Sequence, residues 1–513
     1  MSIYRSARNL LYRFNIWEST LLRAIGYSLA GVGLALLIPI LYDLSTGSDV
    51  MPFLVPMLFC LCVSLPLILL FASGKDLRPV DGLLTIVAIW CVVTLVSAIP
   101  FVLCGMTFID GFFESVSGFT TTGATVISDF DQYQKGLFLW RSFTQWIGGI
   151  AIILIFVTLF PMLGLGGRSV FKDEVSAFGP KNFSSRMRDT AKEFCIVYGI
   201  LSGIFLIACL MMGVNIFESF CLTFSTISTG GFLPFQSDTG VGVYPVYVQM
   251  LVIVFMFLGG TNFYLHYQRI YRKKGTGYLG NSEFRFMLIL FAFISVIVFG
   301  LTYGVAGTDV LTHAVETLFT VVSFGTTAGY VVSDIGGWIA VPAAMGILFL
   351  LMLIGGSSGS TSGGVKTGRA VAVLRSMMSD FNKRIHPRAV SDVKLGKETL
   401  DDNIISAAYV LVILFIFTII AGYLCLLALE PSLNGEGALM ISLSTVTNTG
   451  FADPYLSDGG FATFSGPSKI LLSVLMWVGR LEVGTAVIVF TPFFWREVRR
   501  GGWKLRRIRE RSL

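Results

Sequence analysis

The sequence predicts an all-α integral membrane protein with ten transmembrane helices. Two N-terminal spans precede four span–pore-loop–span repeats, which we expect to have pseudo-four-fold symmetry around one central pore. The 513 residues are 54% hydrophobic and only 13% charged, whereas soluble proteins carry about 25% charged residues. Many apolar runs approach the roughly 20 residues that a spanning helix needs. The hairpins between basic clusters also repeat one pattern of glycine and small hydroxyl residues.

Ten apolar runs are the predicted spans. The run nearest the start lacks the short core and the small-residue cleavage site of a signal peptide, so we interpret it as a true span. The ten runs are Ala24–Tyr42, Pro52–Ala72, Leu83–Cys104, Ile147–Leu165, Phe194–Val214, Tyr247–Leu265, Phe286–Leu301, Ile339–Gly355, Ala407–Leu429 and Ile470–Phe494.

Basic residues gather between alternate spans. Long hairpins separate these clusters and carry few Lys or Arg, except for Lys135 and Arg141 in the first hairpin. This positive-inside pattern predicts a multi-pass protein of the inner or plasma membrane with both termini in the cytoplasm. It also explains the net charge of +6 without a nucleic-acid partner. The clusters are Lys75/Arg78, Arg168–Lys192, Arg269–Arg285, Lys366–Lys397 and Arg496–Arg511.

Four stretches rich in Gly and Thr can be aligned on one glycine each. In every stretch a Ser stands six residues before that glycine, and small hydroxyl residues lie between the two. The stretches are Ser117–Ala124, Ser225–Phe232, Ser323–Tyr330 and Ser444–Phe451, and the shared glycines are Gly123, Gly231, Gly329 and Gly450. The second span of each repeat carries a further glycine signal, at Gly148–Gly149, Gly259–Gly260, Gly355–Gly356 and Gly479–Arg480.

The segment before each stretch is too short to cross a bilayer, which predicts a half-helix that returns as an extended loop. Such backbone is tolerated at membrane depth only where protein or a water-filled cavity covers it. Small side chains let backbone carbonyls point inward, and rings of carbonyls replace the hydration shell of a cation. The partly negative half-helix ends would face this cavity. We interpret Asp110, Glu218 and Glu316, near the half-helix starts, as N-terminal caps, and the alternative is that they raise the cation concentration at the entrance.

The second span of the third repeat is broken by a run too rich in Gly and Ser for a stable helix interior. The run would lie just below the predicted filter, on its cytoplasmic side, and a passive flexible kink is one interpretation of it. Its residues are Gly355, Gly356, Ser357, Ser358, Gly359, Ser360, Thr361, Ser362, Gly363 and Gly364. A phosphate-binding loop is excluded, because Val365 separates Gly364 from Lys366 and no strand precedes the run.

Arg480 lies inside the last apolar run, where a charge is expensive and usually functional. Glu482 is its candidate partner. Lys366 and Arg369 are interpreted as ordinary anchors at the end of a span.

Phe112–Thr125, Gly479–Val483 and Phe490–Glu497 resemble the Trk/Ktr/HKT superfamily of potassium transporters, in particular its TrkH branch. This resemblance implies potassium uptake, with K⁺ held in the filter by backbone carbonyls of the residues before each filter glycine. Glycine at every filter position, Gly123 included, is similar to potassium-permeable members, whereas some plant relatives have Ser in the first loop and prefer sodium. The implied ligands are Thr121, Thr122, Thr229, Gly230, Thr327, Ala328, Asn448 and Thr449.

The resemblance further implies a homodimer and a cytosolic nucleotide-binding regulatory subunit. The run Gly355–Gly364 is similar to an intramembrane loop of the family that obstructs the pore, which implies that the run is a gate. Arg480 is similar to a pore-facing arginine of the family that would repel cations or pair with the gate. The basic segments Arg168–Lys192 and Lys366–Lys397 are candidate docking surfaces, although contact with anionic lipid explains their charge equally well.

We expect five segments: 1–73, the two N-terminal spans; 74–168 and 169–270, the first two repeats; 271–385, the third repeat with the gate; and 386–513, the fourth repeat and basic tail. A sodium-selective or sodium-coupled relative remains an alternative, as do passive and proton-coupled transport. A membrane enzyme is disfavoured, because the sparse His and unclustered acids supply no nucleophile–base pair or metal cluster. No catalytic or cofactor-binding residue is therefore predicted.

Overall fold

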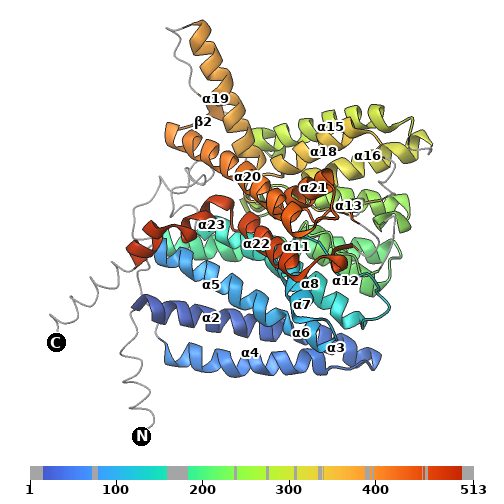
Figure 1. The fold of residues 1–513 in the computed structure, drawn as a ribbon, viewed down its shortest axis with the longest axis vertical. Helices are drawn as coiled ribbons and strands as arrows, with labels where there is room; N and C mark the ends of the chain where they lie inside the picture. Colours follow the sequence, from blue (N-terminus) through green and yellow to red (C-terminus); the bar gives the residue numbers. More distant parts are fainter. Residues whose placement is uncertain are drawn as a thin grey trace, which may run out of the picture. The chain divides into compact units, whose positions relative to one another are not determined.

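The computed structural model describes residues 16–71, 79–158, 183–235, 240–272, 277–305, 309–332, 338, 340–386, 393–395, 398–452, 455–456 and 460–498. These residues are mainly helical (Figure 1), as predicted. The strands among them are β1 (Lys394–Leu395) and β2 (Glu398–Thr399), which form one antiparallel pair. The chain forms two compact units: one from 1–115, 133–140 and 484–513, the other from 116–132 and 141–483.

Several predictions fall on residues that the structure does not describe. They include the segment boundaries at 73/74 and 168/169, both termini, and the basic residues of 168–182 and 499–511. Lys75 and Arg78 lie outside the described residues as well.

The N-terminal helices belong to the first unit. They are α2 (Ile16–Ala35), α3 (Leu37–Thr46), α4 (Met51–Leu70), α5 (Pro79–Ser97) and α6 (Ile99–Leu103). Two glycines of α2 lie against α4: a Cβ on Gly26 would come within 2.8 Å of the Leu67 Cβ, and one on Gly33 within 3.1 Å of the Cys60 Cβ. Small residues at such positions let two helix backbones approach closely, which is how helices associate in lipid.

The four predicted half-helices are all present. Three of them have 12 residues and one has 16, which corresponds to about 18 and about 24 Å, short of the roughly 30 Å of a bilayer core. They are α7 (Phe108–Phe119), α12 (Ile216–Ile227), α16 (Val310–Gly325) and α21 (Gly435–Val446). The first spans of repeats 2 to 4 are α11 (Phe183–Met211), α15 (Ser282–Thr302) and α20 (Asp402–Leu429).

The second spans differ among the repeats. Repeat 1 has one continuous helix, α8 (Lys135–Thr158), which starts at Lys135 rather than at the predicted Ile147. Repeat 2 has α13 (Val246–Gly259), a 99° bend and α14 (Phe263–Tyr267). Repeat 3 has α18 (Pro342–Ile354), the predicted gate run and α19 (Thr367–Ile385). Repeat 4 has α22 (Gly466–Arg480), a 113° bend and α23 (Val483–Phe490).

The number of spans differs from the prediction. Seven described helices are long and apolar enough to cross a membrane, and the two bent pairs raise this number to nine. The predicted span Ile339–Gly355 contains only the 13-residue helix α18, which ends where Gly355 has φ +70°. The described residues thus hold seven to nine candidate spans, and the ten-span symmetric arrangement stays a prediction.

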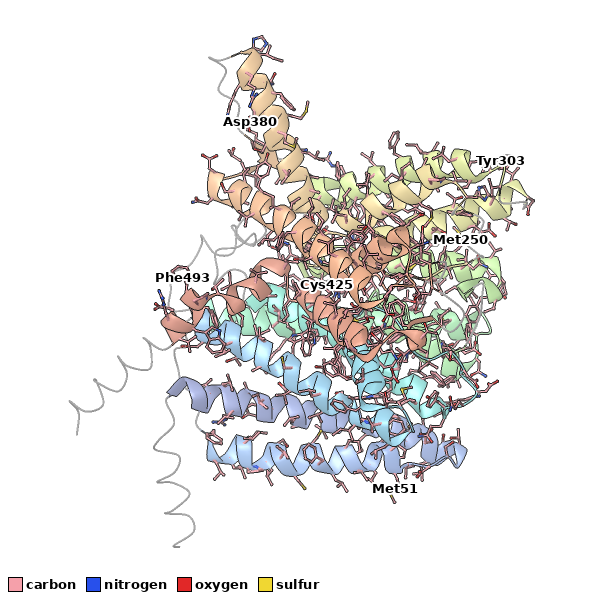
Figure 2. The ribbon with its side chains drawn as sticks, viewed as in Figure 1. Met51, Met250, Tyr303, Asp380, Cys425 and Phe493 are labelled. Atoms are coloured by element: carbon pink, nitrogen blue, oxygen red, sulfur yellow. The ribbon has the colours of Figure 1, made fainter. Side chains whose placement is uncertain are left out.

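One face of α20 exposes large apolar side chains, as a lipid-facing helix does. Between 38% and 68% of each of these side chains is exposed. Figure 2 marks Met250 of α13 and Cys425 of α20 among the other exposed side chains. The chain is therefore a multi-pass membrane protein. The exposed residues of α20 are Val410, Ile413, Ile416, Phe417, Ile420, Leu424 and Leu429.

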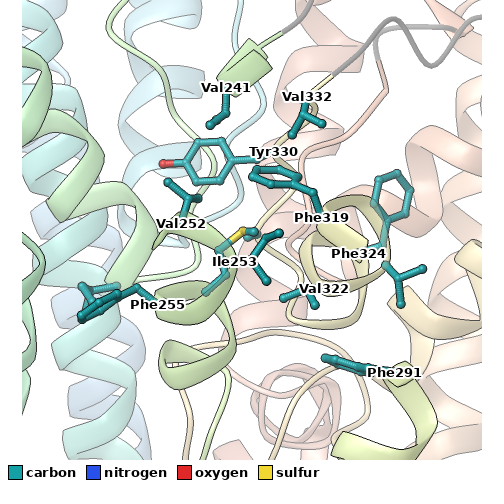
Figure 3. Close-up of a cluster of buried hydrophobic side chains, with 14 of the residues drawn as sticks. Val241, Val252, Ile253, Phe255, Phe291, Phe319, Val322, Phe324, Tyr330 and Val332 are labelled. Atoms are coloured by element: carbon teal, nitrogen blue, oxygen red, sulfur yellow. The ribbon is translucent and has the colours of Figure 1, made fainter. Parts of the chain in front are cut away.

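The largest core cluster lies where repeats 2 and 3 meet (Figure 3). Val252 and Ile253 of α13 pack there with Phe319 and Val322 of α16. Tyr330, which follows the third filter glycine, is 1% exposed in the same cluster. The filter turn of repeat 3 is thus packed against an apolar core.

The half-helix caps correct one prediction. The Asn215 side chain accepts a hydrogen bond from the Phe217 N–H at 2.9 Å and caps α12. Asp309 caps α16, and the hydrogen bond from the Thr312 hydroxyl holds the pKa of Asp309 below its ordinary value. Capping by Glu218 is therefore wrong, since that carboxylate accepts the Tyr244 hydroxyl at 2.6 Å.

Capping by Glu316 is wrong for a similar reason, because its carboxylate lies 3.8 Å from His313 Nδ1. Asp110 does take part in a cap: its N–H donates to the Thr107 hydroxyl at 3.2 Å, and that hydroxyl donates to its carboxylate at 2.7 Å.

Candidate functional site

Each half-helix ends in a turn with an unusual backbone. The residue two before each filter glycine has positive φ, between 50° and 56°, and so has the glycine itself, between 73° and 88°. Left-handed φ is uncommon for any residue but glycine, and especially for a β-branched one. The four turns therefore share one backbone conformation at two equivalent positions. The non-glycine residues are Thr121, Thr229, Thr327 and Asn448.

The four turns form a closed ring. A Cβ on any filter glycine would overlap the carbonyl oxygen of the residue before the next filter glycine. The order runs from repeat 1 to 2, 3, 4 and back to 1. The contacts are Gly123 with Gly230, Gly231 with Ala328, Gly329 with Thr449 and Gly450 with Thr122. The structure thus brings together in one ring the turns that carry all eight predicted ligands.

Hydrogen bonds fix each turn to the end of its own half-helix. The Thr121 N–H donates to the Gly118 carbonyl and the Thr122 N–H to the Ser117 carbonyl, both at 2.9 Å, and equivalent bonds recur in the other three repeats. The shared Ser also has a role: the Ser117 hydroxyl donates to the Ala124 carbonyl at 2.6 Å. Each turn is therefore held at the partly negative end of a half-helix, which favours a cation.

Glycines of the second spans leave room for these half-helix ends. A Cβ on Gly148 would overlap the carbonyl oxygen of Phe119, and one on Gly479 that of Val446. A Cβ on Gly259 would lie 2.8 Å from the Ile227 carbonyl oxygen. In all three cases the carbonyl lies four residues before the filter glycine, so the glycine signals of these repeats mark one packing contact.

The predicted gate run lies against the ring. The Thr361 hydroxyl donates to the Ile227 carbonyl at 3.1 Å, and the Gly363 N–H donates to the Thr327 hydroxyl at 2.6 Å. The Thr229 hydroxyl lies 3.3 Å from the Thr361 hydroxyl. The run therefore contacts two of the four left-handed filter residues through their side chains.

Arg480 holds this run. Its side chain is 3% exposed, and its Nη1 donates to the Thr361 carbonyl at 2.7 Å. Lys366 donates to the Ser362 carbonyl. Both basic side chains line a pocket together with Asn448, Glu482 and the gate run. Positive charge in such a pocket opposes the passage of a cation.

Three predictions about charged residues are wrong. Lys366 is 8% exposed and has φ +80°, so it is a buried part of the gate region and not a surface anchor. Arg369 is not a free anchor either, since its Nη2 lies 2.9 and 2.8 Å from the two carboxylate oxygens of Glu482. Glu482 therefore pairs with Arg369 and not with Arg480.

Two residues with evident roles were not predicted. Glu283 of α15 is 5% exposed and accepts the Ser358 N–H of the gate run at 2.7 Å. Gln145 of α8 is fully buried and contacts the filter turn of repeat 2. Both precede the predicted spans, Gln145 that of Ile147–Leu165 and Glu283 that of Phe286–Leu301, and each has polar neighbours in the sequence, so no signal singled them out.

A ring of four re-entrant turns carried by membrane-spanning helices defines an integral membrane protein of the ion-transport class. The family model of TrkH, described as a cation transport protein, matches residues 53–497. The chain belongs to this family. Family membership confirms the resemblance drawn from the sequence.

Curated relatives cover most of the chain. The Trk system potassium uptake protein TrkH of Halomonas elongata is 31% identical over 438 residues, which are 83% of this chain and 88% of the relative. The protein of the same name from Escherichia coli is 30% identical over 430 residues, 82% of this chain and 87% of the relative. These names are those of transporters, which confirms the prediction that the chain is not an enzyme.

A solved structure has the same fold. The crystal structure of the potassium transporter TrkH from Vibrio parahaemolyticus superposes with a TM-score of 0.83 at 28% sequence identity. The match covers 93% of this chain and 99% of the solved chain.

Proposed function

We propose that the protein takes up potassium ions across the cell membrane through the ring of four filter turns. The observation that carries this proposal is the ring itself: four left-handed turns, each at the end of a half-helix, in which every filter glycine meets the carbonyl of the next repeat. K⁺ would bind in the filter through the eight predicted backbone carbonyls, which replace its hydration shell. The potassium uptake proteins among the relatives support this choice of ion.

The gate run, residues 355–364, would control this path. Its hydrogen bonds to Ile227, Thr327 and Arg480 support a closed state, in which the run covers the inner end of the filter. Opening would require the run to leave these partners. Movement of α19, which directly follows the run, is the simplest way to pull it away.

We propose that a regulatory subunit moves α19. This partner would be a cytosolic nucleotide-binding protein that docks to the basic segments Arg168–Lys192 and Lys366–Lys397. The assembly would be a homodimer with both termini in the cytoplasm. Figure 1 shows α19 running away from α15 and α18. It exposes Met378, Phe381 and Ile385 beside Lys383 and Arg384 of its last turn, which is a surface suited to a partner.

We also propose that the chain is organised in the five segments 1–73, 74–168, 169–270, 271–385 and 386–513. The recurrence of half-helix, filter turn and second span supports this division.

The function is tested by rubidium uptake into liposomes that contain the purified full-length protein. We expect K⁺ to inhibit the uptake at much lower concentration than Na⁺. The variant Gly123→Ser serves as a control and should lose part of this discrimination, because its side chain would overlap the Gly230 carbonyl. Equal inhibition by Na⁺ and K⁺ in the unmutated protein would overturn the potassium proposal and favour a sodium-permeable transporter.

A further inference from the structure

Arg141 departs from the positive-inside pattern, and its position in the structure explains why. It does not lie in a loop but inside α8, where it is 2% exposed. Its Nη1 donates to the Leu233 carbonyl at 3.1 Å, and its guanidinium carbon lies 3.5 Å from the centre of the Phe232 ring. Both contacted residues come directly after the filter glycine Gly231. A buried cation of repeat 1 thus lies against the filter segment of repeat 2.

Gln145, one helical turn further along α8, contacts the same filter turn at three points. Its Nε2 donates to the Gly230 carbonyl at 2.6 Å, and its Oε1 accepts the Phe232 N–H at 3.3 Å and the Ser225 hydroxyl. Gly230 is one of the proposed K⁺ ligands, and Ser225 is the Ser shared by all four repeats. One side-chain amide therefore forms hydrogen bonds with the residue that starts this turn, with a proposed K⁺ ligand and with the residue after the filter glycine.

The other three repeats carry no amide at this position. When the second spans are aligned on their glycines, the position of Gln145 lies three residues before Gly148, and that of Arg141 lies seven before it. All the residues at the two equivalent positions are buried. Repeats 2, 3 and 4 have Met256, Met352 and Met476 in place of Gln145, and Val252, Leu348 and Leu472 in place of Arg141.

We propose that Gln145, supported by Arg141, is a positioning residue that sets the ion discrimination of the filter. The inference rests on the proposed function. A carbonyl oxygen has two lone pairs, so Gly230 can accept Gln145 with one and still face an ion with the other. The amide fixes the distance of this carbonyl from the centre of the ring. Without the amide the turn is free to close around a smaller cation, and the preference for K⁺ over Na⁺ falls.

The test compares two buried glutamines. Gln145→Met installs the residue that the three sister repeats already carry, with similar length and no hydrogen bond. Gln249→Met is the matched control: Gln249 is a buried residue of α13 that donates to the Tyr244 carbonyl at 2.8 Å, away from the filter. The readout is the ratio of the Na⁺ to the K⁺ concentration that halves rubidium uptake by the full-length protein in liposomes.

We expect Gln145→Met to lower this ratio by about tenfold, the effect of losing one or two net hydrogen bonds, and Gln249→Met to leave it unchanged. Gln145→Glu keeps the acceptor for Phe232 and Ser225 but cannot donate to Gly230 when ionised, so it should lower the ratio as well. If Gln145→Met does not fold, the ratio measured for Gln145→Glu tests the role of Gln145.

An unchanged ratio in the folded variants would overturn the inference. A ratio that falls equally in Gln249→Met would also overturn it, because the effect would then follow from any loss of a buried amide. The unmutated protein separates this failure from that of the proposed function. If it does not discriminate between the two ions, the proposed function fails; if it discriminates and the variants do too, only the role of Gln145 fails.

Discussion

The four filter turns are nearly alike, whereas the four second spans beside them take three different forms. Each turn has a left-handed backbone at the same two positions and makes the same contact with the next turn. Of the second spans, α8 is continuous, α13 and α22 end in sharp bends, and α18 gives way to the gate run. The difference indicates a division of labour. Residues of the ring are constrained by its close contacts, while residues of the second spans are free to differ among the repeats.

We expect the largest effect on uptake when one filter turn is made different from the other three by a single added methyl group. In Gly329→Ala the new Cβ would overlap the Thr449 carbonyl oxygen at φ +73°, a backbone conformation that alanine disfavours. We expect rubidium uptake to fall by about a hundredfold or more, which corresponds to about 2.8 kcal/mol. Gly346→Ala in α18 is the control, since no atom lies within 4 Å of its Cβ. Uptake that survives in Gly329→Ala would contradict the proposed ring.

The gate run is specific to repeat 3, and releasing it should raise uptake. Arg480→Gln removes both a positive charge and the hydrogen bond to the Thr361 carbonyl. A hydrogen bond from a charged group contributes about 1.5–3 kcal/mol, so we expect initial uptake to rise by about tenfold.

Arg480→Lys keeps the charge but loses the geometry of the guanidinium, and it shows which of the two matters. Uptake that is unchanged or reduced in Arg480→Gln, at equal amounts of folded protein, would speak against the gate.

The ion pair between Arg369 of α19 and Glu482, in the bend between α22 and α23, joins two interrupted second spans. We therefore expect its loss to change stability near the gate run and to leave ion discrimination by the filter unchanged. Arg369→Gln and Glu482→Gln should each lower the melting temperature in detergent. The double variant should lose less than the sum, with a coupling free energy of about 1 kcal/mol. The ratio of Na⁺ to K⁺ inhibition should not move. Additive losses would show that the two side chains are not coupled.

We expect the smallest effect from a substitution at the N-terminus of the half-helix α12, the end that lies away from the ring. Asn215→Ala removes the cap of α12 and should cost about 0.5–1 kcal/mol of stability without changing ion discrimination. Asn215→Asp preserves the acceptor and should restore the stability. A change in discrimination with Asn215→Ala would mean that cap and filter are coupled along the half-helix.

The four glycine turns could be predicted because four copies of one pattern stand in register, and steric crowding in a ring allows few alternatives to glycine. The break between α18 and α19 was equally predictable, since ten residues rich in Gly and Ser do not form a stable helix interior. Local composition determines both features, and neither depends on how distant segments meet. The roles of filter and gate stay proposals.

The pairing of charged groups could not be predicted in the same way. Arg369 and Glu482 lie 113 residues apart, and they meet only because a bend after Arg480 brings Glu482 to the start of α19. Sequence proximity favoured Arg480 as the partner of Glu482, but the left-handed backbone of Glu482, with φ +59°, turns it elsewhere. The described residues give seven to nine candidate spans, because hydropathy does not register the glycines at which helices such as α18 stop.

The gate run also bears on why the four repeats share one polypeptide. A ring made of four identical chains would carry four copies of any plug, and the axis of a narrow pore has room for one. Because the repeats are covalently joined, a single repeat can contribute Gly355–Gly364 while the others retain compact helical joints. The same linkage lets repeat 1 alone bear Arg141 and Gln145. The joining of four repeats in one chain therefore allows the proposed gate run to occur once for each ring, without being repeated at every equivalent position.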